Sequence, residues 1–194
     1  SQSDIDRLGA TIVDLGNNSA TTESTITDFA MRIAGSGTQI GMTEAQILGL
    51  SASLASVGIQ AEMGGSAIST IMSQIDKDVA HNGEDLAAWA DAAGMSAQEF
   101  AQVWETDAAG ALVSLIGGMQ EASESGSNLN LILDDLGVTE IRKTDTLKRL
   151  TSAAGLMATT MDTATNAWQQ NTALTNEAAQ RYSTTESKLL MLKN

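Results

Sequence analysis

Apolar residues recur at every third or fourth position along most of the chain, with polar residues between them. The first such stripe consists of Ile5, Leu8, Ile12 and Leu15. Similar stripes follow within residues 26–33, 47–57 and 68–79. This spacing places the apolar side chains on one face of an α-helix, and no segment shows the sustained alternation that is typical of β-strands. The pattern therefore predicts an all-α fold, a multi-helix bundle of short capped helices followed by a long C-terminal helix.

Capping signals precede several of these stripes. Thr43-Glu-Ala-Gln46 and Ser96-Ala-Gln-Glu99 have capping-box spacing, in which the hydroxyl accepts the amide three residues on and the longer side chain reaches back. Thr22 and Thr106 are predicted to open two further helices. The predicted helix ends fall at glycines, namely Gly16, Gly58, Gly94 and Gly137.

The last part of the chain differs from the rest. All 17 glycines lie at or before Gly155. Beyond that point a heptad-like spacing continues, and the residues of this C-terminal seam are Met157, Met161, Ala164, Trp168, Tyr182, Leu189 and Leu192. We therefore expect a compact acidic helical domain over residues 1–155, and over 156–194 a long uninterrupted helix that starts a rod or coiled-coil segment.

Composition narrows the chemistry. The chain contains no cysteine and no proline. The lack of cysteine excludes disulfides and thiol catalysis, and the lack of proline favours uninterrupted helices. Because the sequence begins at Ser1 without a basic and apolar leader, we expect a fragment of a longer chain without a signal peptide.

The charge is strongly acidic, with 24 acidic against 10 basic residues and a net charge of −14. Residues 156–194 hold three of each sign, so the whole excess lies in residues 1–155. Nucleic acid would be repelled by such a domain, and no nucleic-acid partner is predicted. The acidity serves solubility or, alternatively, attracts a basic partner surface. The basic cluster Arg142, Lys143, Lys148 and Arg149 is interpreted as a surface helix that balances nearby acids, or contacts an acidic partner.

Candidate catalytic groups are few. His81 is the only histidine, and its place before Asn82-Gly83 suits a helix C-terminus better than a catalytic or metal role. Carboxylate pairs occur at Asp76/Asp78, Glu84/Asp85 and Asp134/Asp135. We interpret them as solvated charge, with a glycosidase pair as the weaker alternative. The glycine pairs at 35–37 and 64–65 fit close helix approach better than phosphate binding. We predict no enzyme, and no catalytic, cofactor-binding or metal residue.

Membrane insertion has one candidate segment. Residues 45–61 carry no charge, but serine and glutamine dilute the segment and it is shorter than a membrane span. We expect a buried helix of a soluble domain and no stable membrane span. A membrane-active helical module remains an alternative.

Five blocks of the sequence resemble the core region of phage tail tape measure proteins, the minor-tail type of long-tailed phages and prophages. They cover residues 6–35, 41–75, 93–119, 136–150 and 167–194, essentially the whole chain in the same order. The most specific is "GMTEAQILGLSASLASVGI", residues 41–59, with Met42 where the family usually has leucine.

The resemblance implies a structural role. Tape measure proteins are long helical chains that set tail length during assembly and leave the tail ahead of the DNA at infection. Their implied location is the lumen of the phage tail in the virion, and the host bacterial cytoplasm during assembly. The implied partners are tail assembly chaperones, the tail tube protein and tail-tip proteins, with self-association through the C-terminal helix. The alternative is a cell-wall-degrading or membrane-active helical module of the tail used in host penetration.

Overall fold

The computed structural model describes residues 2–171, 176–177 and 180. Over these residues the chain is all-α, with ten named helices and no strand. The helices are α1 (Gln2–Asn18), α2 (Glu23–Gln39), α3 (Glu44–Ser56), α4 (Ala61–His81), α5 (Glu84–Ala92), α6 (Ala97–Thr106), α7 (Ala108–Glu124), α8 (Leu129–Asp135), α9 (Ile141–Ser152) and α10 (Ala154–Gln170). The predicted all-α class is confirmed.

Both predicted capping boxes form. The Thr43 hydroxyl accepts the Gln46 amide at 3.2 Å, and the Gln46 side chain accepts the Thr43 amide at 2.9 Å. Ser96 and Glu99 make the same reciprocal pair at the start of α6. These contacts satisfy amides that have no partner inside the helix, so the sequence itself fixes where α3 and α6 begin.

Most predicted helix ends are also confirmed. Gly58, Gly94 and Gly137 have φ values of 73°, 70° and 68°, a left-handed conformation that glycine adopts without steric cost. Gly16 was expected to end the first helix, but α1 continues through it to Asn18. A single glycine costs a helix only about 1 kcal/mol, so it does not have to end one.

The predicted start at Thr106 is wrong. Thr106 is the last residue of α6, and Asp107 caps α7 by accepting the Gly110 amide at 3.0 Å. Aspartate and threonine are both good helix caps, so adjacent candidates cannot be separated by residue preference alone.

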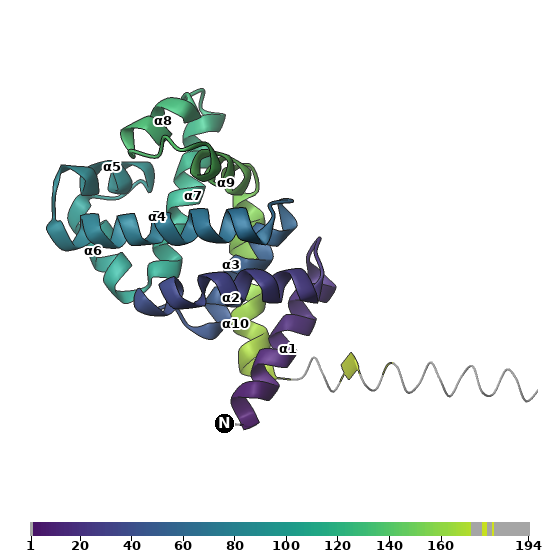
Figure 1. Ribbon diagram of the computed structural model, residues 1–194. Coiled ribbons are helices and arrows are strands. Elements are labelled where there is room, and N and C mark those ends of the chain that lie inside the picture. The colour runs from purple at the N-terminus through teal and green to yellow at the C-terminus, as the bar shows by residue number, and fades with distance from the viewer. Residues whose placement is uncertain (1, 172–175, 178–179, 181–194) are drawn as a thin grey trace, which may run out of the picture.

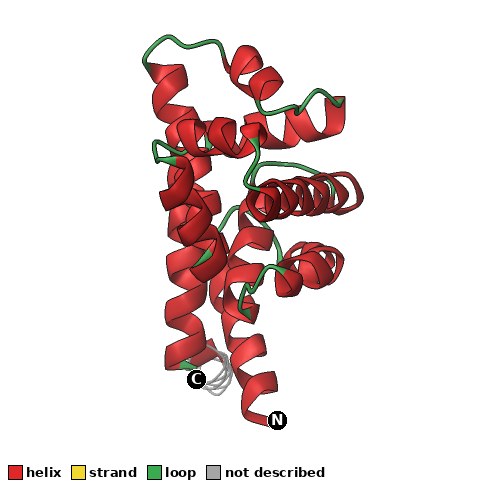
Figure 2. Cartoon of the chain, turned by 90° about the vertical axis from the view of Figure 1, so that its left-hand side faces the viewer, coloured by secondary structure: helices red, strands yellow, loops and turns green. Residues whose placement is uncertain are grey.

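The helices form two crossing sets (Figure 1). α2 and α4 run alongside each other, and α3, α7 and α10 cross behind them. Figure 2 shows α2 and α4 nearly end-on beside the second set. α3 lies at the centre, where it contacts α2 on one side and α10 on another, and ten of its 13 residues are buried.

A main apolar core joins α2 to α10, with Leu50, Ile71, Trp89, Phe100 and Leu115 all fully buried. Burying a side chain of this size contributes roughly 1.5–3 kcal/mol. A second, smaller cluster lies where α1 meets α2, α3 and α10, and consists of Leu15, Ile26, Leu48, Ala52 and Ala164. The predicted stripes of α3 and α4 supply much of this core.

The predicted long C-terminal helix is not confirmed. α10 begins at Ala154 and ends at Gln170, because Asn171 adopts a left-handed conformation with φ 51°. α10 contacts α3 and α1 rather than extending away from them. The predicted division of the chain near residue 155 stays a prediction, while the break in the described helix lies at Asn171.

Candidate functional site

The C-terminal seam is divided by the structure. Met157, Met161 and Ala164 are at most 8% exposed, covered by the chain's own helices. Trp168 is half-buried near the end of α10. Tyr182, Leu189 and Leu192 lie outside the described residues. The first three seam residues therefore serve the fold of one chain, and a second chain has no access to them while the domain is folded.

The contact between α3 and α10 is close because Gly49 faces α10. A β-carbon at Gly49 would lie 3.0 Å from the Met161 Cα and from the Thr160 carbonyl oxygen, both backbone atoms. One turn further along α3, the buried hydroxyls of Ser53 and Thr160 share a hydrogen bond. Each hydroxyl has one proton, so one of the two donates to the other, and the one that accepts can donate to a carbonyl oxygen of its own helix, Gly49 for Ser53 or Met157 for Thr160. Two helices can approach this closely only where no β-carbon intervenes and the buried polar atoms are paired.

The start of α1 is joined to the end of α10. The Arg7 guanidinium donates hydrogen bonds to the carbonyl oxygens of Trp168 and Gln169. These carbonyls belong to the last turn of α10, where carbonyl groups lack partners within the helix. A cation at this end of a helix is also favoured by the helix dipole. Arg7 was not singled out from the sequence, because its partners lie 161 and 162 positions away and have no sequence signal.

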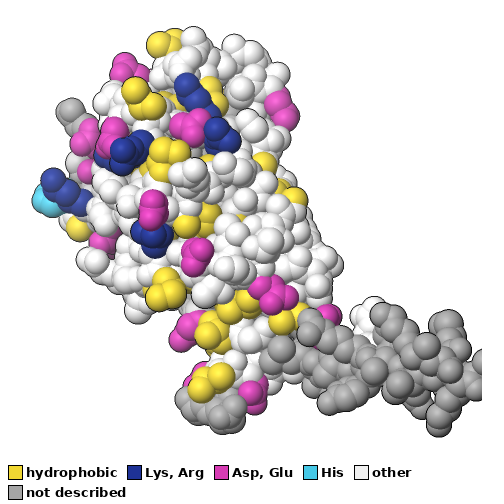
Figure 3. Space-filling view, turned by 45° about the vertical axis from the view of Figure 1, so that its right-hand side comes forward, with side chains coloured by type: hydrophobic (Ala, Val, Ile, Leu, Met, Phe, Trp, Pro, Cys, Tyr) yellow, Lys and Arg dark blue, Asp and Glu magenta, His cyan; other side chains and the backbone are white. Residues whose placement is uncertain are grey.

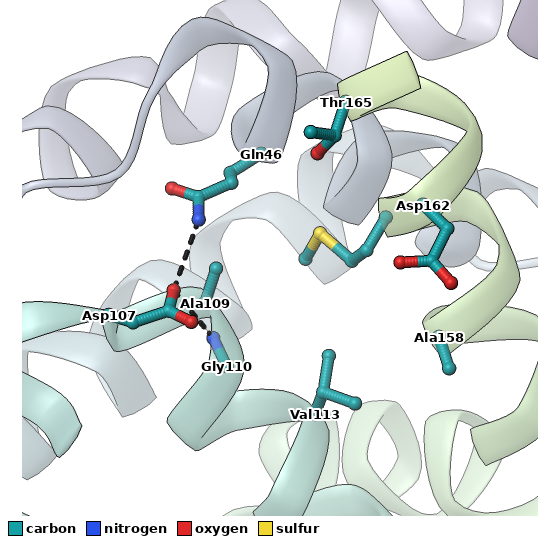
Figure 4. A pocket seen from close by; sticks show the side chains of 9 residues that line it. Gln46, Asp107, Ala109, Gly110, Val113, Ala158, Asp162 and Thr165 are labelled. Atoms are coloured by element: carbon teal, nitrogen blue, oxygen red, sulfur yellow. Dashed lines mark hydrogen bonds between the residues drawn. The ribbon is translucent and has the colours of Figure 1, made fainter.

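A cavity of about 270 Å³ lies between α3, α7 and α10 (Figure 4). It is lined by Gln46, Asp107, Ala109, Gly110, Val113, Ala158, Met161, Asp162 and Thr165. Asp107 Oδ1 accepts both the Gly110 amide and the Gln46 side-chain amide, the latter at 3.1 Å. The carboxylates of Asp107 and Asp162 lie on opposite sides of the pocket (Figure 4). The lining residues include the two carboxylates of Asp107 and Asp162 but no histidine, lysine or cysteine.

The carboxylate pair Asp76/Asp78 has structural contacts. The indole nitrogen of Trp89 donates to Asp78 Oδ2 at 2.8 Å, and that of Trp104 donates to Asp76 Oδ1 at 3.1 Å. A buried tryptophan needs an acceptor for its N–H group, and the two half-buried aspartates of α4 provide one each. These contacts bind α5 and α6 to α4. The acceptors of both tryptophans lie on another helix, and no local sequence pattern indicates them.

The remaining candidate groups lie on the surface. Asp134 and Asp135 are exposed, as is Asp85. His81 is exposed at the end of α4, and its Nδ1 donates to the Lys77 carbonyl oxygen at 2.7 Å, as its predicted helix-end position suggests. Among the described residues, no group of three or more histidine and acidic side chains could hold a metal ion.

The basic residues of α9 are partly paired. Lys143 forms an ion pair with Glu140 at 3.3 Å, and Arg149 pairs with Asp145 at 3.0 Å. The Arg149 guanidinium also donates to the Val57 carbonyl oxygen at the end of α3. On the face shown in Figure 3, basic side chains are interspersed with acidic ones and do not form a continuous basic surface. This agrees with the interpretation of α9 as a surface helix that balances nearby acids.

The candidate membrane segment, residues 45–61, covers most of α3, the turn after it and the first residue of α4, and α3 itself is a buried helix of 13 residues. In the part of the chain that the structure describes, no helix combines the length and the apolarity that a membrane crossing requires.

Comparison with protein-family models, with curated protein sequences and with solved structures found no match for this chain.

Proposed function

We propose that this chain is a structural segment of a phage tail tape measure protein, which sets tail length during assembly and leaves the tail ahead of the DNA. The observation that carries the proposal is the block at residues 41–59. It resembles the family most specifically, and it coincides with α3, from the Thr43 capping box to the left-handed Gly58. The segment most like the family is thus also a central helix of the fold, which contacts α1, α2 and α10.

The polar contacts support a role through packing rather than through a reaction. Asp107 and Thr43 cap helices, Asp76 and Asp78 hold tryptophans, and Arg7 joins two helix ends. Each of these side chains has a place in holding helices together. A segment that acts through its length and its partners requires such contacts and no converging catalytic groups.

The acidic charge of the domain supports a role in which the chain lies beside DNA but does not bind it. The domain carries the whole acidic excess of the chain, and an acidic surface repels a duplex. Within the proposal, the chain occupies the tail lumen and meets tail assembly chaperones, the tail tube protein and tail-tip proteins. Tight binding of duplex DNA at about 150 mM salt would contradict this part of the proposal.

The test uses tails purified from the phage or prophage that encodes the chain. Peptides of residues 2–171 are measured by mass spectrometry in intact tails and in tails that have ejected their DNA. We expect the peptides in intact tails and their loss after ejection. Tails that lack the chain before ejection, or that retain it fully afterwards, would overturn the proposal.

The alternative, a module used in host penetration, is tested on the chain alone. Hydrolysis of purified cell wall, abolished when Asp134 and Asp135 are both changed to asparagine, would favour an enzyme. Leakage of dye from liposomes would favour a membrane-active module. We expect neither activity from the folded domain.

A further inference from the structure

The two ends of the folded domain lie side by side. α1 starts and α10 finishes at the same end of the molecule, and the two helices run in opposite directions there (Figure 1). Arg7 near the start of the domain binds the carbonyls of Trp168 and Gln169 at its end. Force applied to the chain on both sides of the domain would therefore act first on the contact between α1 and α10.

The apolar side chains of α1 are less buried toward the start of the helix. Along its apolar stripe, Leu15 is 1% exposed and Leu8 is 39% exposed, and Ile5 reaches 63%. The first turns of α1 thus bury little apolar surface, which is a property of segments that open locally at low free energy. The end of α1 that receives the force is the end with the least apolar burial.

We infer that this contact is a mechanical joint, and that tension along the chain opens the domain by first separating α1 from α10. Adjacent ends are pulled apart sideways, so the contacts between the two helices break one after another rather than all together. Loss of α10 then uncovers α3, which has α10 as a main neighbour. The remaining helices follow once the central helix is exposed.

In a tape measure chain, such a joint would let this segment contribute two different lengths, one folded and one opened. This consequence rests on the proposed function, whereas the joint itself does not. While the domain is folded, residues 2 and 170 lie at the same end of it (Figure 1). The domain therefore adds little to the distance between the chain segment before it and the chain segment after it. Opened into a continuous helix, residues 2–170 would span about 250 Å at about 1.5 Å per residue. Tension along a tape measure chain would therefore change the length that this segment contributes.

The test is single-molecule pulling of the chain in optical tweezers. The sequence contains no cysteine, so handles attach only at introduced ones. One geometry uses Ser3→Cys with Gln170→Cys, and the other uses Ser3→Cys with Ser127→Cys, in the loop after α7; all three positions are exposed. We expect a lower unfolding force in the first geometry, with a first step that releases the 17 residues of α1 and the 17 of α10. Equal forces in the two geometries, or one step that releases the whole domain, would overturn the inference.

A pair of variants tests the role of Arg7. Arg7→Met keeps an apolar stem but removes the donor to the end of α10. Arg32→Met is the matched control, because Arg32 pairs with Glu62 between α2 and α4, at 3.3 Å, away from the joint. In the Ser3–Gln170 geometry we expect Arg7→Met to lower the force of the first step and Arg32→Met to leave it unchanged. An unchanged first step in Arg7→Met, with wild-type circular dichroism, would show that Arg7 does not fasten the joint.

These measurements use the chain alone, so their outcome can be distinguished from the outcome of the test of the proposed function. A failed pulling experiment leaves the mass-spectrometric test in tails unaffected. Absence of the chain from tails would overturn the proposed function but would leave a measured joint standing.

Discussion

Two adjacent glycines of α7 have opposite surroundings. A β-carbon at Gly118 would collide with the backbone carbonyl of Ala92 in α5, whereas a β-carbon at Gly117 meets nothing within 4 Å. Gly118→Ala should therefore lower the free energy of unfolding by about 1–3 kcal/mol through overpacking. Gly117→Ala should raise it by up to about 1 kcal/mol, because alanine favours a helix more than glycine does. Urea unfolding of both variants checks this, and effects of the same sign would contradict the close approach of α7 to α5.

Burial along the stripes gives a second test at single residues. Leu54 is fully buried, and Leu131 of α8 is 62% exposed. Leu54→Ala should cost about 2–5 kcal/mol of unfolding free energy, since it removes packed atoms and leaves a cavity. Leu131→Ala should change it by less than about 0.5 kcal/mol. Thermal melts of the two variants compare them directly, and equal melting temperatures would show that the stripe of α3 is not buried.

What the sequence could predict about single residues depended on how local their roles are. The interpretation of Gly64 and Gly65 as sites of close approach holds, because β-carbons there would meet Phe29 and Arg32 of α2. In the pair at 35–37 the interpretation holds for Gly37, where a β-carbon would lie 2.9 Å from Ile47 of α3, and does not hold for Gly35, which has nothing within 4 Å. Helical spacing identifies the buried face of a helix, but it does not identify the element that covers a given position.

The N-terminal cap of α7 also links two helices. Asp107 accepts the Gly110 amide of its own helix and the Gln46 side chain of α3. Asp107→Ala removes both contacts and should cost about 1–2 kcal/mol of unfolding free energy. Asp107→Asn is the matched control, because asparagine caps a helix about as well and keeps an acceptor oxygen. Urea unfolding should place Asp107→Asn near the wild type; a loss equal to that of the alanine variant would point to the charge instead of the hydrogen bonds.

The helices themselves could largely be predicted, because caps and stripes are local. The capping boxes of α3 and α6 involve residues only three apart, and both form as predicted. The link from Asp107 to Gln46 joins residues 61 apart, and no local pattern indicates it. The end of α10 was missed for a related reason, since asparagine adopts the left-handed conformation less readily than glycine and gives a weaker stop signal.

The arrangement of the whole molecule could not be predicted from the stripes. Met157, Met161 and Ala164 have the spacing of a coiled-coil seam, and the same spacing serves a helix that covers its own domain. A sequence does not distinguish the two, because both need an apolar face of the same period. In the folded chain these three residues belong to the core clusters of the described helices.

Two shortened chains test whether α10 is required for the fold. A chain of residues 1–153 lacks α10, which would expose α3 around Gly49 and Ser53 and remove Met157 and Met161 from the core. A chain of residues 1–171 keeps every described helix that contributes to the core. We expect the longer chain to unfold cooperatively on heating, with a clear circular-dichroism transition, and the shorter one to lose that transition, because its central helix has lost a main neighbour. Similar melting temperatures for the two chains would show that α10 is dispensable, and would favour the predicted boundary near residue 155. Loss of the transition only in the shorter chain would mean that separating α10, by truncation or by tension, is enough to open the domain.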